Sequence, residues 1–343
     1  MKRRILFINN YAMLPIWNAW KEGLGSDTHL WGANWMESDG LTVKVPPARG
    51  SWPLNHLPVN MRWGDLDQQL RAWWRCDYDL LYAGAPGPVM GLGALRALRL
   101  FRKPIVVVMH HPPPSGRQPA LCLRGFDRIL CLTRLLHEDL IQRFPAIADR
   151  LIRIEWGPDI AYHRPETGTP EFLLCEGKTL RDYETLCSAL VQVPIATRLF
   201  TTSDCAPNSP PSCVDLRMVP PTGYAEAGRQ INASYPKSLA VAIPLRDHAM
   251  LIGLTSLVTA MARGKAVICT RNPSLEIDIG AEGCGRWVRP GSVTDWVEAL
   301  RSLRDHPDEW CAMGERGRIL CEQRFNSGVF GHKVSEVVQC DDI

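Results

Sequence analysis

Short apolar runs alternate with longer amphipathic segments along most of the chain. Residues 104–109 (PIVVVM) form the clearest run of the first half, and residues 266–269 (AVIC) form a similar run in the second half. Apolar runs of this length, bounded by glycine or proline, are typical of strands that are buried on both faces. The segments between them, such as 293–304 and 307–322, carry apolar residues at helical spacing. We therefore expect an α/β protein with parallel sheets.

The same pattern predicts elements throughout both halves. The predicted strands of the first half are residues 5–8, 28–36, 41–46, 79–84, 104–109, 126–132 and 151–156, and its predicted helices are 65–74, 89–101 and 135–144. The predicted strands of the second half are residues 172–176, 198–202, 214–219, 238–245 and 266–269, and its predicted helices are 184–190, 224–231, 254–262, 276–277, 293–304, 307–322 and 329–338.

A hinge is predicted between the halves. Gly157, Pro158 and Pro165 follow a predicted strand, and glycine and proline together interrupt regular structure. We expect an N-terminal domain over residues 1–165 and a C-terminal domain over 166–325, each Rossmann-like and doubly wound, facing a central cleft. The last helix, within 326–343, could cross back to the first domain.

Composition narrows the class of protein. The chain has 343 residues, of which 45% are hydrophobic and 22% charged, and its formal net charge is +3. These values suit a globular protein and give no reason to expect nucleic acid as a partner. One basic stretch contains Arg96, Arg99, Arg102 and Lys103. It could touch an anionic acceptor or a membrane surface, although a solvated helix face is the simpler interpretation.

The sequence also bears on the cellular compartment. No signal-peptide pattern follows the basic start of the chain, and no uncharged apolar run approaches the roughly 20 residues of a membrane helix. The 12 cysteines are scattered and form no C-x-x-C pair, which favours buried thiols over disulfides or zinc ligands. We therefore expect a cytoplasmic protein.

The stretch GLTSLVTAMARGKAVICTR, residues 253–271, predicts a helix opened by glycine and followed at once by a buried strand. The first N–H groups of such a helix have no partner within the helix, and the helix dipole is positive there. Thr255 and Ser256 add hydroxyl groups where a phosphate would sit. This helix start is therefore a candidate anion site, with an ordinary α/β helix as the alternative.

This stretch, with Gly253-Leu254-Thr255 followed by AMARGKAVI at 260–268, resembles the nucleotide-sugar-binding segment of glycosyltransferase family 4. Enzymes of that family have the two-domain GT-B fold. Many of them carry two glutamates eight positions apart, where this chain has Leu251 and Thr259. The resemblance implies that the donor diphosphate faces the helix start.

The resemblance also suggests which residues contact the donor. Lys178 and Arg181 lie on a glycine turn just past a predicted strand, a placement in which two cations suit a diphosphate. The family has basic residues at these two places. The expected donor-binding residues are Lys178, Arg181, Gly253, Leu254, Thr255, Ser256, Thr259 and, near the nucleotide base, Thr202.

Two histidines close the predicted strand at 104–109. In the resembled family a histidine at this place lies beside the donor sugar, so His110 is the candidate catalytic residue and His111 the alternative. A histidine titrates near neutral pH and exchanges protons with hydroxyl groups. A capping or core histidine is the competing interpretation.

Three further residues have two interpretations each. Trp17 or Trp20 could line an acceptor cleft, because an indole offers a flat apolar face to a sugar ring; packing explains most tryptophans equally well. Asp247 could replace the absent glutamate, but aspartate is also a common turn residue.

Together these features favour a glycosyltransferase that moves a sugar from a nucleoside diphosphate sugar, UDP-linked by the resemblance, to an acceptor hydroxyl. The resemblance implies retention of configuration, no metal ion and no further cofactor. The acceptor could be a glycan, a lipid-linked sugar or a small molecule, with peripheral membrane contact left open. A sugar-nucleotide epimerase of the same fold and a non-catalytic partner subunit are the alternatives.

Overall fold

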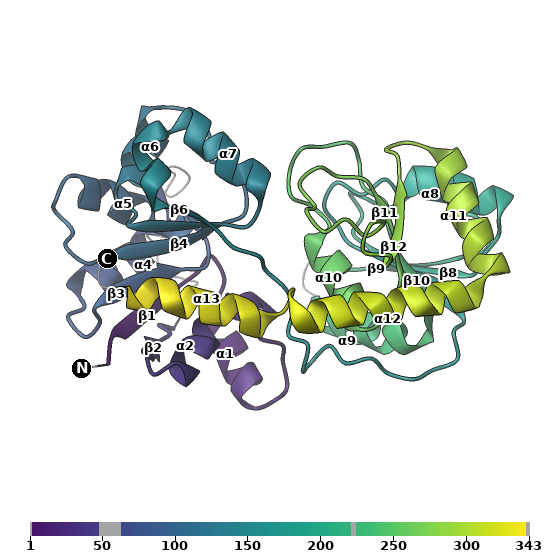
Figure 1. Ribbon diagram of the computed structural model, residues 1–343, viewed down its shortest axis with the longest axis horizontal. Coiled ribbons are helices and arrows are strands. Elements are labelled where there is room, and N and C mark those ends of the chain that lie inside the picture. Colours follow the sequence, from purple (N-terminus) through teal and green to yellow (C-terminus); the bar gives the residue numbers. More distant parts are fainter. Residues whose placement is uncertain (1, 48–62, 221–223, 341–343) are drawn as a thin grey trace. The chain divides into compact units, whose positions relative to one another are not determined.

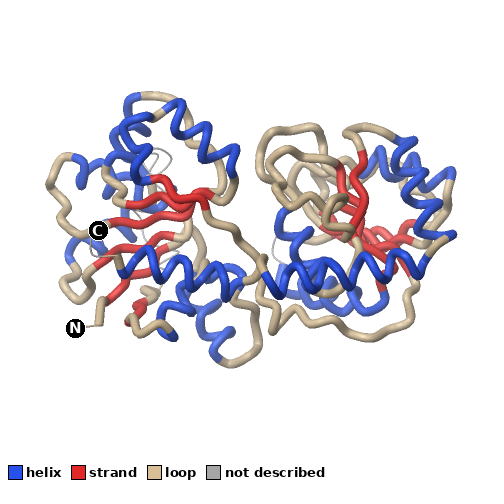
Figure 2. The backbone as a smooth tube through the Cα atoms, in the orientation of Figure 1, coloured by secondary structure: helices blue, strands red, loops and turns tan. Residues whose placement is uncertain are grey.

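The computed structural model describes residues 2–47, 63–220 and 224–340, and these fold into two compact units. Unit 1 comprises Met1–Asp159 and Ser327–Ile343, and unit 2 comprises Ile160–Asn326. The chain therefore passes from one unit to the other at residue 159, slightly before the boundary expected from the sequence. Each unit contains a parallel sheet flanked by helices (Figure 2).

Unit 1 is built on a six-stranded sheet in the order β2-β1-β3-β4-β5-β6. Its strands are β1 (Arg4–Ile8), β2 (Thr42–Lys44), β3 (Leu80–Ala83), β4 (Ile105–Met109), β5 (Arg128–Cys131) and β6 (Leu151–Arg153). Its helices are α1 (Met13–Lys21), α2 (Ala33–Ser38), α4 (Leu66–Trp74), α5 (Met90–Ala97), α6 (Arg117–Arg124), α7 (Arg134–Arg143) and α13 (Ser327–Gln339). The C-terminal helix α13 packs against α2 (Figure 1).

Unit 2 has a second six-stranded parallel sheet, in the order β12-β11-β10-β7-β8-β9. Its strands are β7 (Phe172–Glu176), β8 (Thr197–Thr201), β9 (Val214–Met218), β10 (Ser238–Ile243), β11 (Val267–Thr270) and β12 (Gly285–Val288). Its helices are α8 (Tyr183–Gln192), α9 (Tyr224–Ser234), α10 (Leu254–Ala262), α11 (Val293–Asp305) and α12 (Pro307–Gln323).

The central strands are fully buried, as their unbroken apolar sequences require. Every residue of β4 is buried, and so is every residue of β11. Each sheet contributes to its own hydrophobic core, with Leu81 and Val107 in unit 1 and Leu173 and Ile268 in unit 2. The parallel sheets inferred from the apolar runs are therefore confirmed.

Two predicted elements are wrong. The segment 28–36 is not a strand: it contains a 3₁₀ turn at Thr28–Leu30 and the start of α2, because Trp31 and Gly32 take the left-handed conformation, with φ of 51° and 76°. No helix forms at 276–277 either. There the Asp278 carboxylate accepts from the backbone N–H groups of Gly280 and Ala281 and stabilises a turn instead.

Candidate functional site

The strand order of unit 2 marks a place for a ligand. Numbered from β7, the order is 3-2-1-4-5-6, so β7 lies between β8 and β10. The chain leaves β7 toward one side of the sheet and later returns through β10 on the other side. In open α/β sheets, ligands bind at the carboxyl ends of the strands where the winding reverses. The loops after β7 and β10 are therefore the first place to look.

Backbone hydrogen bonds join these two loops. The N–H of Asp182 donates to the carbonyl of Pro244 at 3.1 Å, and the N–H of Arg246 donates to the carbonyl of Leu180 at 2.9 Å. Arg181 and Leu245 form an isolated antiparallel bridge between them. The residue before α8 is thereby held beside the loop that leads into α10.

The Arg181 side chain crosses from the first loop to the start of α10. It is only 5% exposed. Its Nη2 donates to the Ser256 hydroxyl at 3.1 Å, and its Nε donates to the Glu176 carbonyl at 3.2 Å. Its Nη1 is buried and has no hydrogen-bond partner among the described residues. A buried N–H group of a cation without a partner is costly, so this atom is ready to donate to an anion.

Gly177 makes room for this arrangement. Its φ is +129°, and a Cβ atom there would lie 2.2 Å from the Nε of Arg181. Only glycine avoids both the backbone strain and the clash. The Arg181 side chain thus occupies space that any other residue at 177 would fill.

The start of α10 offers a second set of donors. The residue before the helix, Gly253, has φ +82°, and no described side chain caps the helix by a hydrogen bond. The first hydrogen bond of the helix runs from Leu257 N–H to the Gly253 carbonyl at 2.9 Å. Thr255 is exposed and the Ser256 side chain faces Arg181. Uncapped N–H groups, a positive helix dipole and a guanidinium therefore converge, which suits an anion.

The carboxyl group of Glu176 interacts with the charge of Arg181. Glu176, the last residue of β7, is partly buried, and the Tyr235 hydroxyl donates to its Oε1 at 3.0 Å. Burial raises the pKa of this carboxyl, while hydrogen bonding to Tyr235 and the charge of Arg181 lower it. Sequence reasoning placed Glu176 in the strand and assigned it no role. Its position at the end of β7, beside the glycine turn, was the available signal.

The other predicted donor-binding residues occupy three kinds of place. Lys178 is exposed on the loop that carries Arg181. Thr202 directly follows β8 and is 9% exposed, and its hydroxyl has no hydrogen-bond partner among the described residues. Thr259 is buried in the middle of α10, while Asp247 is exposed on the loop before it. Among the contacts described above, only the hydrogen bond between Arg181 and Ser256 directly joins two of the predicted donor-binding residues.

In unit 1, His110 follows β4 at the carboxyl edge of the sheet. Its ring centroid lies 4.5 Å from that of Trp31 and 6.1 Å from that of His111. Burial, helped by the charge of His111, lowers the pKa of His110 to about 4. Its Nε2 is buried without a hydrogen-bond partner among the described residues. At neutral pH the imidazole is therefore uncharged, with one nitrogen ready for a hydroxyl group.

His111 differs from its neighbour mainly in exposure. The residue is exposed at the surface, and partial burial of its imidazole ring lowers its pKa from the ordinary value. The tryptophan beside His110 is Trp31, whose ring also lies 5.4 Å from that of Trp156. Trp17, weighed as a lining of an acceptor cleft, is instead 5% exposed and belongs to the core. Nothing in the apolar pattern singled out Trp31, because its position depends on the left-handed turn at 31–32.

Carboxylates that the sequence places close together have structural partners. Asp65 caps α4 by accepting from the Gln68 N–H at 3.0 Å, and Asp67 pairs with Arg71. Asp77 and Asp79 pair with basic side chains as well. Within the described residues, no group of three or more His, Cys, Asp or Glu side chains is arranged to hold a metal ion.

The structure is similar to several solved structures. Sucrose-phosphate synthase from Thermosynechococcus elongatus matches with a TM-score of 0.71 at 15% identity over 99% of this chain and 98% of its own. A glycosyltransferase from Rickettsia africae matches with a TM-score of 0.66 at 12% identity over 98% of each chain. HepE from Anabaena, in a complex with UDP-glucose, matches with a TM-score of 0.62 at 13% identity over 98% of this chain and 99% of its own.

These similarities confirm the expected GT-B fold with its two Rossmann-like units. At such low identity they establish the fold and not the reaction. No protein-family model matches the chain, and no curated protein sequence does either. Across the described residues, no helix is long and apolar enough to span a membrane.

Proposed function

We propose that the chain is a glycosyltransferase that takes a sugar from a nucleoside diphosphate sugar and transfers it to an acceptor hydroxyl. The observation that carries this proposal is the Arg181 guanidinium at the uncapped start of α10, with a buried Nη1 that lacks a partner among the described residues. The GT-B fold supports the proposal, because it makes sugar transfer a natural use of such a site.

A diphosphate has the charge and shape that this site requires. When the bond between sugar and phosphate breaks, negative charge grows on the departing nucleoside diphosphate. Fixed N–H donors and a cation stabilise that charge more than they stabilise the bound donor, so they accelerate the reaction. In this proposal Arg181 and the N–H groups at the start of α10 hold the diphosphate, with Ser256 positioning Arg181.

The remaining donor residues follow the same logic. Lys178 is exposed on the loop that carries Arg181, and Thr255 is exposed at the start of α10. From these places a flexible ammonium and a hydroxyl can reach the oxygens of a bound diphosphate. We assign the base to the neighbourhood of Thr202, whose buried hydroxyl lacks a partner among the described residues. We take uridine as the base because HepE, a protein with a similar fold, binds UDP-glucose.

His110 is the candidate that acts on the transferred sugar. Because its pKa is about 4, its imidazole is neutral at pH 7 and exchanges a hydrogen bond with a sugar hydroxyl without charging first. His111 is the alternative because it is the next residue and is more exposed. We further propose that transfer retains the anomeric configuration and that diphosphate stabilisation by protein groups suffices without a metal ion.

Nucleotide release from UDP-glucose tests the proposal without knowledge of the acceptor. Slow hydrolysis by the wild-type protein should be detectable, and Arg181→Ala should reduce kcat/KM about 100-fold, since losing charge-assisted hydrogen bonds costs about 3 kcal/mol. Arg304→Ala, an exposed arginine on α11, is the matched control and should retain the wild-type rate.

Other outcomes of this experiment have defined meanings. Interconversion of two sugar nucleotides would show that the protein is an epimerase rather than a transferase. If UDP-glucose binds but no nucleotide is released with any acceptor, the chain is a binding protein. A wild-type rate in Arg181→Ala would overturn the assigned site.

A further inference from the structure

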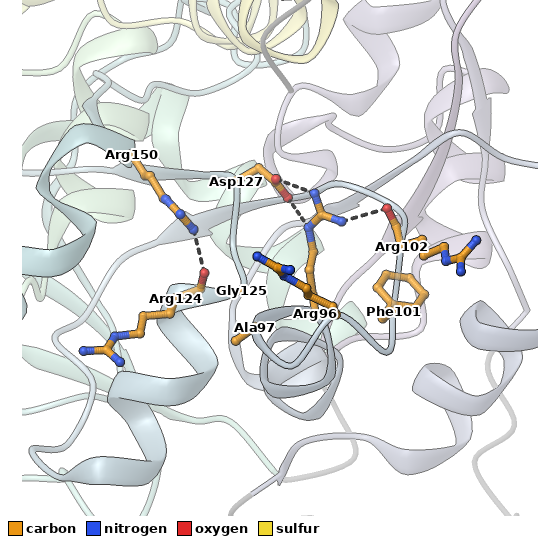
Figure 3. A pocket seen from close by; sticks show the side chains of 9 residues that line it. Arg96, Ala97, Phe101, Arg102, Arg124, Gly125, Asp127 and Arg150 are labelled. Carbon is orange, nitrogen blue, oxygen red and sulfur yellow. Dashed lines mark hydrogen bonds and ion pairs between the residues drawn. The ribbon is translucent and has the colours of Figure 1, made fainter.

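A second basic site lies in unit 1, at the opposite edge of the sheet from His110. It is a pocket of about 550 Å³, lined chiefly by Arg96, Arg99, Arg102, Arg124, Arg150 and Asp127 (Figure 3). These residues come from the ends of α5 and α6 and from the segments that precede β4, β5 and β6. Because β4 runs from this edge to His110, about 16 Å of strand separates the two places.

Part of the lining is structural. Arg96 makes a two-pronged pair with Asp127, with its Nη2 at 2.5 Å from Oδ1 and its Nε at 2.7 Å from Oδ2. Its Nη1 also donates to the Arg102 carbonyl at 2.7 Å. The Nη1 of Arg150 donates to the Arg124 carbonyl at 2.5 Å. These bonds, drawn in Figure 3, fix the floor of the pocket and connect its three segments.

The remaining three arginines have no such partners. Arg99, Arg102 and Arg124 are exposed, and no hydrogen bond or ion pair joins their guanidinium groups to another described residue. Figure 3 shows Arg102 and Arg124 extending away from the Arg96–Asp127 pair. Exposed arginine side chains change rotamer readily, so these groups can turn toward a ligand seated over the floor.

The balance of charge favours an anion. Five arginines line the pocket against one aspartate. The carboxyl ends of α5 and α6 also point here, and each adds a partial charge of about −0.5. These negative contributions explain part of the arginine content, because cations stabilise helix C-termini. They offset fewer than half of the five positive charges, and a positive pocket remains.

The backbone at Arg99 supports a role for its side chain. The N–H of Arg99 donates to the Arg96 carbonyl at 2.9 Å, and the N–H of Leu100 donates to the Leu95 carbonyl at 2.8 Å. This pair of bonds ends α5 in a Schellman motif, in which the residue with positive φ is usually glycine. Arg99 takes that position with φ of 62°. A charged side chain is thus held at a place where glycine would cost less.

We propose that this pocket binds a phosphate-bearing anion, and that it is a site separate from the one at α10. Arginine forks match the oxygens of phosphate in pairs, and several forks around one cavity favour a ligand with more than one negative charge. The volume suits a small phosphorylated molecule or a phosphorylated lipid headgroup. The exposed Leu98 and Leu100, 57% and 60% accessible, adjoin Arg99 and would meet the apolar part of a lipid.

Calorimetric titration with inorganic pyrophosphate tests the proposal for a soluble ligand. The pocket variant is Arg102→Gln/Arg124→Gln, which removes two arginines that lack partners among the described residues and leaves the Arg96–Asp127 floor intact. The charge-matched control is Arg301→Gln/Arg304→Gln on α11. The pocket variant should bind pyrophosphate about tenfold more weakly than the control. Arg181→Gln separates the two sites, because it should leave the binding lost in the pocket variant unchanged.

Sedimentation with phosphatidylcholine vesicles, with and without about one-third phosphatidic acid, tests the lipid source. Binding that needs phosphatidic acid and is lost in the pocket variant shows that the ligand is a lipid phosphate. Weaker pyrophosphate binding without any vesicle binding identifies a soluble ligand. If the pocket variant and the control behave alike in both experiments, the proposal is overturned. This result does not depend on nucleotide binding at α10, which the Arg181 variant reports separately.

Discussion

The two units place different chemistry at equivalent edges of similar sheets. In unit 2 the carboxyl edge carries Arg181 and the uncapped start of α10. In unit 1 the same edge carries His110 beside Trp31. Both key side chains are largely buried, and each has one buried nitrogen without a hydrogen-bond partner among the described residues. The sheets are alike, so the difference arises from the residues that follow the strands.

Burial has opposite consequences for the two side chains. A guanidinium stays charged when it is removed from water, so the unit 2 edge presents a cation and a positive helix end. An imidazole gives up its proton instead, and the pKa of His110 falls to about 4. One edge therefore suits an anion, and the other suits a neutral polar group such as a hydroxyl. The proposed function requires this contrast, because it assigns the diphosphate to the edge of unit 2 and the transferred sugar to His110 of unit 1.

The largest expected effect is on the pH dependence of the free energy of unfolding, because His110 is uncharged in the folded protein. Its pKa is about 4 in the folded protein and 6.5 ordinarily, so between these values the unfolded state binds more protons. The free energy of unfolding should therefore fall as pH drops from about 6.5 to 4, with at most about 3 kcal/mol attributable to this group. Denaturant unfolding of wild type and His110→Gln measures it: the variant should lose correspondingly less stability across this window.

Equal slopes in the two proteins would mean that folding does not lower the pKa of His110. The contrast between the two edges would then fail, because burial would no longer keep the imidazole uncharged as the pH falls below 6.5.

The second-largest expected effect is on kcat, which should depend on the unit 1 edge while UDP affinity depends on the unit 2 edge. His110→Ala should reduce kcat about 100-fold, since a positioned proton-exchanging group contributes about that much or more, while UDP affinity changes less than twofold. Steady-state kinetics and calorimetry on the same sample measure both quantities. His111→Ala is the matched comparison, and a larger loss of kcat there would move the role to His111.

Two glycine substitutions, one at the carboxyl edge of each sheet, should show which edge binds the nucleotide. In Gly177→Ala the new Cβ would lie 2.2 Å from the Nε of Arg181, so the guanidinium must move. UDP affinity should fall about 30-fold, roughly 2 kcal/mol. In Gly84→Ala the Cβ would lie 2.6 Å from Cδ1 of Trp31, so only the unit 1 edge is disturbed and UDP affinity should not change. Calorimetry on both variants decides whether nucleotide binding belongs to one edge.

The smallest expected effect concerns Ser256. Its hydroxyl accepts from Nη2 of Arg181 at 3.1 Å, so Ser256→Ala should loosen the guanidinium without removing it. We expect UDP to bind about fivefold more weakly, near 1 kcal/mol. Ser335→Ala, a buried serine on α13 of unit 1, is the control. A loss as large as that expected for Gly177→Ala would make Ser256 a direct ligand.

The regular parts of the fold were predictable because both faces of their strands are buried. Unbroken apolar runs such as residues 105–109 of β4, with a proline directly before them, favour a strand buried on both faces. The segment around Trp31 was not predictable, since its course depends on two consecutive residues with positive φ. Helix α6 was missed too: its mean polarity is high and Pro119 lies within it, although proline is tolerated in a first turn.

The candidate site was predictable to the level of residue types and loops. The sequence indicated a helix start after Gly253 and a basic loop after β7, and the contact between Arg181 and Ser256 joins those two elements. It did not indicate that Arg181 would be buried while Lys178 stays exposed. That distinction depends on the backbone bonds between residues 180–182 and 244–246, and pairing between distant loops leaves no periodic signal.

Calorimetric titration with UDP, GDP, ADP and dTDP, on wild type and Arg181→Ala, tests the central claim most directly. Selective binding of one nucleotide, about 100-fold weaker in a variant that still unfolds cooperatively, is the result expected if the edge of unit 2 holds a diphosphate. Equal affinity in both proteins, or no binding of any of the four by the wild type, would contradict the account.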